Sequence, residues 1–121
     1  MTFATWTLAG LLAVFYLYAG GVKLLHSREQ LLPMMEWVDR TPMPAVRAVG
    51  LVEVLGALGL VLPPLAGTAP CLAAAAAAGF VLLQLAATGV HLARGDRRIA
   101  LNAVLLLAAV ATLVLAARTW C

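Results

Sequence analysis

The sequence predicts an all-α integral membrane protein: a four-helix bundle with a short amphipathic helix at the membrane interface, between the first two spans. Hydrophobic residues make up 64% of the chain and charged residues 11%, whereas soluble domains average about 45–50% apolar and about 25% charged residues. Four apolar runs lie at about residues 3–25, 45–62, 70–93 and 99–117, and each approaches the roughly 20 residues that a membrane span requires. They nearly exhaust the 121 residues, so we expect a single membrane domain.

The first run carries one charge, Lys23, near its end. Residues 1–6 lack the positive region that begins a signal peptide, so we expect this run to be retained as a helix. Tyr16, Gly20 and Lys23 follow the spacing i, i+4, i+7 and share one helical face.

The segment from His26 to Pro44 is the only long polar connection. Its apolar residues again follow helical spacing with charges between them: Leu31, Met34, Met35 and Val38. This pattern predicts an amphipathic helix at the interface, with Trp37 as an interfacial anchor and Pro33 in its first turn. The second span is expected to end at Pro63-Pro64, and residues 94–98 form a short polar turn between the last two spans.

Glu53 is the one carboxylate inside the second apolar run. A charged group at that depth costs roughly 2.5–3.5 kcal/mol on insertion scales, so it requires a partner or a function. Gly50 and Ala57 flank it on the same helical face and leave room for a neighbouring helix or a ligand. A functional role is favoured over a purely structural ion pair, because ionisable residues inside the membrane are usually functional.

The polar groups that can meet Glu53 are Lys23, Gln84, His91 and Asn102. Lys23 either pairs with Glu53 or extends to the lipid headgroups. Gln84 and His91 share a helical face with Thr88, and this face is expected to point into the bundle. His91 is equally compatible with a structural role, and for Asn102 a structural hydrogen bond is favoured.

Several other kinds of site are not indicated. His26 and His91 occur in no metal-binding spacing, so no metal is expected, and no cofactor can be named. The basic residues lie beside hydrophobic runs, so the net charge of +3 does not indicate nucleic-acid binding. Cys71 and Cys121 both map to the outer end of the bundle, but without a Cys-x-x-Cys motif we expect two unpaired thiols rather than an obligatory disulfide.

The distribution of basic residues predicts the orientation. Seven of the eight fall on the side of the first and third connections, and only Arg118 falls on the other. The seven are Lys23, Arg28, Arg40, Arg47, Arg94, Arg97 and Arg98. The positive-inside rule therefore predicts a multi-pass protein of the cell membrane with both termini outside.

Short motifs resemble the DoxX-like family of small membrane proteins. They are Ala19-Gly20 with Lys23-Leu24, Gly50-x-x-Glu53-x-x-Gly56 with Leu60 and Pro63, then His91 and Asn102. The resemblance covers nearly the whole chain. It implies a four-helix membrane bundle and a link to redox systems, since the family is named after a membrane subunit of a thiosulfate:quinone oxidoreductase. It also implies Lys23, Glu53, His91 and Asn102 as site residues, but the cysteine pairs of redox-active relatives are missing.

Three functions remain open. The first, which we favour, is a membrane subunit that binds a lipophilic, quinone-like molecule beside Tyr16, Lys23, Gln84 and Asn102. The second is an isomerase or cyclase in which Glu53 and His91 act as acid and base on a lipophilic substrate. The third is a structural partner of another membrane or peripheral protein, bound through the basic loops. The lipid bilayer is an expected partner, and a homo-oligomer is left open.

Overall fold

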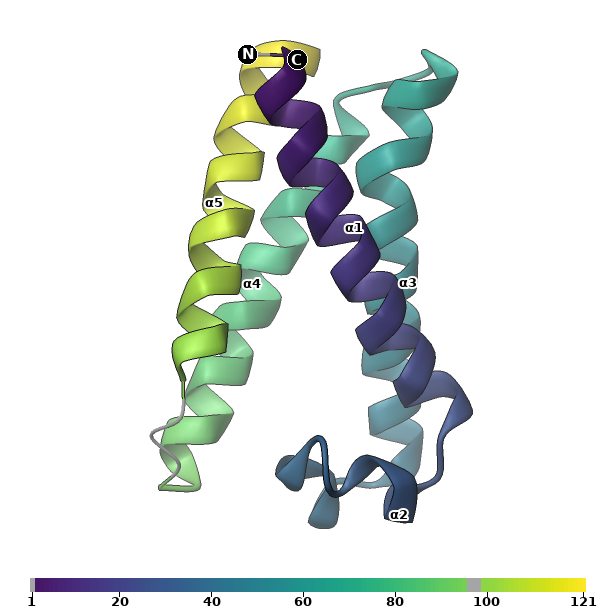
Figure 1. Cartoon of the computed structure of the whole chain (residues 1–121), viewed down its shortest axis with the longest axis vertical. Coiled ribbons are helices and arrows are strands. Elements are labelled where there is room, and N and C mark those ends of the chain that lie inside the picture. Colours follow the sequence, from purple (N-terminus) through teal and green to yellow (C-terminus); the bar gives the residue numbers. More distant parts are fainter. Residues whose placement is uncertain (1, 96–98) are drawn as a thin grey trace.

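Four long helices form a bundle in the computed structural model, which describes residues 2–95 and 99–121 (Figure 1). The long helices are α1 (Thr2–Leu25), α3 (Met43–Ala66), α4 (Leu72–Ala93) and α5 (Ala100–Trp120). Each is long and apolar enough to cross a membrane. The predicted all-α four-helix membrane bundle is therefore confirmed. Residues 96–98 of the turn expected between the last two spans lie outside the described residues.

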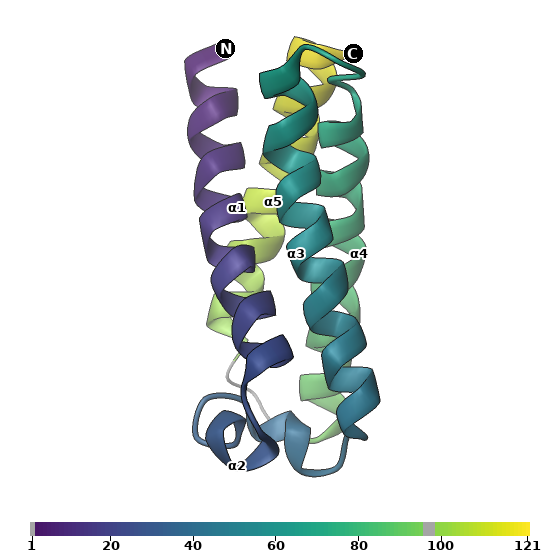
Figure 2. The same ribbon diagram turned by 90° about the vertical axis from the view of Figure 1, so that its right-hand side faces the viewer.

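The bundle is built from two helix pairs, α1 with α3 and α4 with α5. Both termini lie at one end, and α2 (Arg28–Leu31) lies at the other (Figures 1 and 2). At the terminal end the Trp6 and Trp120 rings meet edge to face at 5.1 Å, which joins α1 to α5. Figure 1 shows these two helices diverging towards the α2 end. The core between the pairs is centred on Tyr16 and Phe80.

The connection between α1 and α3 (residues 26–42) contains two short helical pieces instead of one continuous helix. They are α2 and the 3₁₀ helix η1 (Glu36–Asp39). Ser27 caps α2 reciprocally with Gln30, so the helix begins well before Pro33, and it ends at Leu31, two residues before that proline. The buried residues of this segment include Leu31 and Val38, which are fully buried. We refer to residues 26–42 as the connecting segment.

Helix α3 continues beyond Pro63-Pro64, where its end was predicted. The prolines remove two N–H donors but do not force a stop within that turn. The helix ends at Gly67, whose φ of 70° is left-handed, a conformation that glycine adopts without penalty. The N–H of Gly67 donates to the Pro64 carbonyl and that of Thr68 to the Pro63 carbonyl, which is a Schellman ending.

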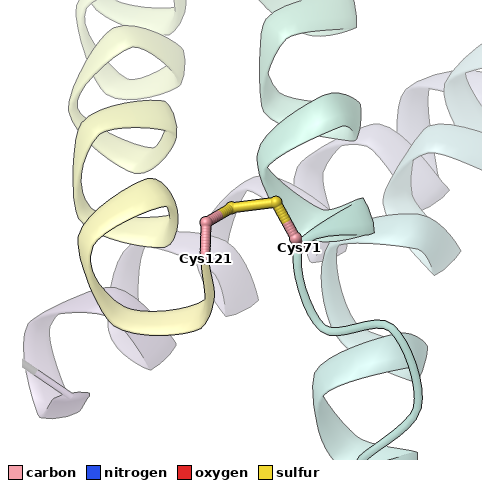
Figure 3. The surroundings of a disulfide bond; sticks show 2 residues. All are labelled: Cys71 and Cys121. Atoms are coloured by element: carbon pink, nitrogen blue, oxygen red, sulfur yellow. A yellow bond between two sulfur atoms is a disulfide. The ribbon is translucent and has the colours of Figure 1, made fainter.

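The prediction of two unpaired cysteines is wrong. Cys71, just before α4, and Cys121, just after α5, form a disulfide with a Cα–Cα distance of 4.9 Å (Figure 3), within the usual disulfide range. Antiparallel packing places the start of α4 beside the end of α5. Helix α5 also extends to Trp120, three residues beyond the predicted span, which brings Cys121 level with Cys71.

Candidate functional site

Two glycines allow α1 and α3 to cross in backbone contact. A Cβ atom added to Gly20 would lie 2.6 Å from the Gly50 carbonyl oxygen, and one added to Gly50 would lie 2.8 Å from the Gly20 carbonyl oxygen. Such distances are closer than real Cβ contacts, so both positions require glycine. Lys23 and Glu53 each lie three residues beyond one of these glycines. Because α1 and α3 are antiparallel, Lys23 lies beside Gly50 and Glu53 beside Gly20, so the two side chains meet across the crossing.

Lys23 and Glu53 form a buried ion pair. The Lys23 Nζ donates to Glu53 Oε1 at 2.5 Å, and their side chains are 9% and 3% exposed. The expectation that Glu53 meets a polar partner inside the bundle is thus confirmed, with Lys23 as that partner. The surrounding helices therefore shield both groups from the solvent.

Arg47 fixes the end of α1 beside this pair. Its Nη1 donates to the Lys23 carbonyl at 2.5 Å and to the His26 carbonyl at 2.6 Å. The last carbonyls of a helix lack partners within the helix, so a guanidinium from a neighbouring helix is a favourable cap. This contact holds the backbone that carries Lys23 against α3.

A second polar group joins three helices. The Asn102 side-chain amide of α5 donates to Gln84 Oε1 of α4 at 3.0 Å, and the Gln84 amide donates to the Tyr16 hydroxyl of α1 at 2.6 Å. Tyr16 is fully buried, and its ring stacks on Phe80 with centroids 3.8 Å apart. Phe80 in turn occupies the space left by Gly56, where a Cβ would lie 2.6 Å from the Phe80 ring.

Both polar groups line one cavity of about 420 Å³, within the usual size range of small-molecule sites. All four long helices and the connecting segment contribute to its wall. The lining residues are Phe15, Tyr16, Ala19, Lys23, Pro33, Met34, Met35, Glu36, Trp37, Val49, Glu53, Leu83, Gln84, Ala87, His91, Leu101, Asn102 and Leu105. The wall is thus mostly apolar, with a few converging polar groups.

The connecting segment closes one end of the cavity. Residues 33–37 line it, and Arg94 at the end of α4 reaches across to Asp39 at 2.8 Å. A hydrogen bond from Arg94, more than any other interaction, lowers the pKa of the Asp39 carboxyl below its usual value. Arg28 also donates to the Val38 carbonyl within the segment. The Arg94–Asp39 ion pair thus links the connecting segment to α4, and the Arg28 contact holds the segment itself together.

All six residues predicted for the site line this cavity: Tyr16, Lys23, Glu53, Gln84, His91 and Asn102. Glu53 bonds to Lys23, while His91 lies on the wall from α4, partly buried. On the α4 face, Ala87 rather than Thr88 lies between Gln84 and His91 in the lining.

Sequence reasoning missed the aromatic and sulfur-containing wall, namely Phe15, Met34, Met35 and Trp37. It also missed the ion pair between Arg94 and Asp39. The position of Phe80 could have been anticipated from Gly56, because this glycine lies three residues after Glu53 and leaves space on α3 for a large ring. Among the described residues, no group of three or more His, Cys, Asp or Glu side chains is placed to hold a metal ion.

Comparison with known proteins identifies the family. The profile of the DoxX-like family matches residues 7–113, which include α3 and α4 in full, most of α1 and α5, and every polar residue of the cavity. Searches among curated proteins and among solved structures gave no match. With its four apolar helices, the chain is a small multi-pass integral membrane protein that belongs to the DoxX-like family.

Proposed function

We propose that this protein binds a lipophilic small molecule in the cavity between its helices, with the polar end of the molecule beside Lys23, Glu53 and Tyr16. One observation carries the proposal: the ion pair and the Tyr16–Gln84–Asn102 chain open onto the same largely apolar cavity of about 420 Å³. Apolar walls with few polar groups suit a ligand that is apolar over most of its length. A quinone-like molecule is one ligand of this kind.

The other two functions receive less support. A purely structural role would use the polar groups in helix–helix bonds alone, whereas here they also line a cavity. Acid–base catalysis is favoured by one observation, that Glu53 and His91 line the same space. Product formed from the bound molecule by wild type, and lost in His91→Gln with binding retained, would favour this enzymatic alternative. We further propose that the binding protein serves as a membrane subunit of a redox-linked system.

Filling the cavity is expected to displace the bound molecule. Ala87 is partly buried and lines the cavity, while the adjacent Ala86 is exposed on the outer side of α4. We expect wild type and Ala86→Phe, released from membranes in mild detergent, to carry a bound species in native mass spectrometry. Ala87→Phe is expected to retain less than about a tenth of it, since the added ring occupies space that the molecule needs; a tenfold loss corresponds to about 1.4 kcal/mol.

Equal retention of that species by Ala87→Phe and Ala86→Phe would contradict the proposal, as would a purified wild-type protein with no bound species even after incubation with lipid extract. The two variants add the same ring at neighbouring positions of α4 and differ only in the side of the helix that carries it. Expression, helicity and lipid content of the preparations are therefore expected to be the same.

We also propose that both termini face the outside of the cell. The seven-to-one distribution of basic residues supports this orientation. The disulfide between Cys71 and Cys121 lies at the same end as the termini, and disulfides persist in oxidising compartments. Two independent features therefore favour the same orientation.

Thiol labelling in intact cells tests this orientation. We expect an impermeant maleimide to label neither native cysteine until an impermeant phosphine has reduced the disulfide, and then to label both. A cysteine introduced at Gly95, in a Cys71→Ser/Cys121→Ser background, is expected to label only after the cells are permeabilised. Labelling at position 95 in intact cells would overturn the orientation.

A further inference from the structure

We propose that the polar end of the bound molecule is an uncharged oxygen acceptor, such as a carbonyl, ester, ether or hydroxyl group, and that the site discriminates against anionic amphiphiles. This inference rests on the proposed function and specifies the chemical class of its ligand. It follows from the charge balance of the cavity wall and from the number of hydrogen-bond donors that remain there.

The charges along the described cavity wall nearly cancel. They belong to Lys23, Glu53 and Glu36, whose formal charges sum to −1. The one lysine is already compensated by Glu53 at 2.5 Å. An anionic head would thus enter a low-dielectric space in which the lysine charge is already balanced.

Donors nevertheless remain beside this pair. An ammonium group has three N–H donors, and the one hydrogen bond of Lys23 Nζ within the described part of the chain goes to Glu53. The Tyr16 hydroxyl accepts from Gln84, so its own hydrogen can be donated elsewhere. Both residues lie on one face of α1, two turns apart, and both line the cavity. These donors suit an oxygen acceptor on the ligand.

Charge and donors together select the head group. An uncharged oxygen can accept from Lys23 or Tyr16 without changing the charge of the site. An anion has to be desolvated in a space where the lysine charge is already balanced by Glu53, which disfavours its binding. We therefore expect anionic probes to bind at least about tenfold more weakly than uncharged ones of equal chain length, which corresponds to about 1.4 kcal/mol.

Fluorescence quenching can measure this selectivity directly. Trp37 lines the cavity, whereas the other two tryptophans, Trp6 and Trp120, lie at the terminal end. In a Trp6→Phe/Trp120→Phe background, Trp37 reports binding of chain-brominated probes with one common tail. The heads are a primary alcohol, a methyl ketone, a sulfonate and a trimethylammonium group, compared at equal mole fraction in micelles of an uncharged detergent.

Saturable quenching by the alcohol and the ketone, absent in Ala87→Phe and at least about tenfold weaker with the sulfonate head, would support the inference. Equal saturable quenching by the sulfonate, or stronger quenching by the trimethylammonium head than by the alcohol, would overturn it and leave the proposed function standing. No saturable quenching by any head, and no difference from Ala87→Phe, would overturn both.

The Glu53→Gln variant tests the charge argument separately. Without Glu53, the Lys23 ammonium lacks its counter-ion, so the sulfonate probe is expected to gain about tenfold relative to the alcohol and to raise the melting temperature of the variant. Glu29→Gln is the matched control: it removes the same charge from an exposed residue outside the cavity wall. This variant is expected to keep the wild-type preference. An unchanged preference in Glu53→Gln would overturn the assignment of selectivity to the ion pair.

Discussion

Replacing Glu53 by glutamine is expected to destabilise the bundle by about 3–5 kcal/mol, the usual cost of removing one partner of a buried ion pair. Both side chains are less than a tenth exposed, so the Lys23 ammonium would remain buried without a counter-ion. Lys23→Met is expected to cost less, because an unpaired buried carboxyl can become protonated. Unfolding in mixed micelles with increasing denaturing detergent would measure both changes.

The double variant Lys23→Met/Glu53→Gln provides the decisive comparison. Removing both charges is often neutral when the replacements pack well, so the double variant is expected to be more stable than Glu53→Gln alone. A loss in the double variant equal to the sum of the single losses would show that the two residues do not act as a pair.

Gly20→Ala is expected to reduce stability by about 1–3 kcal/mol through overpacking at the α1–α3 crossing. The added Cβ would lie 2.6 Å from a backbone oxygen, which cannot move aside as a flexible side chain can. Separation of the helices there would also pull Lys23 away from Glu53. The same detergent titration, together with the binding of the alcohol probe, would measure both consequences.

The neighbouring Gly21 offers the matched control, because a Cβ there meets no atom within 4 Å. Gly21→Ala is expected to leave stability unchanged or slightly higher, since alanine favours a helix by about 1 kcal/mol over glycine. Similar losses for the two alanine variants would indicate a general effect of glycine in α1 rather than contact at the crossing.

Composition and spacing were sufficient to predict the bundle and to name Lys23 among the four possible partners of Glu53, but they did not decide between an ion pair and extension of Lys23 to the headgroups. Four apolar runs of membrane length leave few alternatives to four spans. The equal spacing of Gly20 to Lys23 and of Gly50 to Glu53 places each charge beside a close helix crossing. These features are local, and they depend on the helical period and on the cost of charge in lipid.

Features that depend on how separate segments meet were not predictable in the same way. Predicting the disulfide would have required knowing how α4 and α5 align along the bundle. The last span was predicted to end three residues before α5 ends, so Cys121 was not placed level with Cys71. The connecting segment folds against Val22 and Val46 through Leu31 and Val38, so tertiary packing replaced the single amphipathic helix that its spacing indicated. The cavity wall from Met34 to Trp37 follows from that packing.

Site-specific photo-crosslinking tests the central claim most directly. Leu105 lines the cavity and is 8% exposed, whereas Leu107 on the same helix is 69% exposed to the surroundings. A diazirine amino acid close to leucine in size, placed at each position and activated in native membranes, would report what occupies each space. We predict one defined lipophilic adduct with an uncharged polar end at position 105 and a mixture of bulk phospholipids at position 107. The same phospholipid mixture at both positions, or adducts at position 105 only to neighbouring helices, would contradict the account.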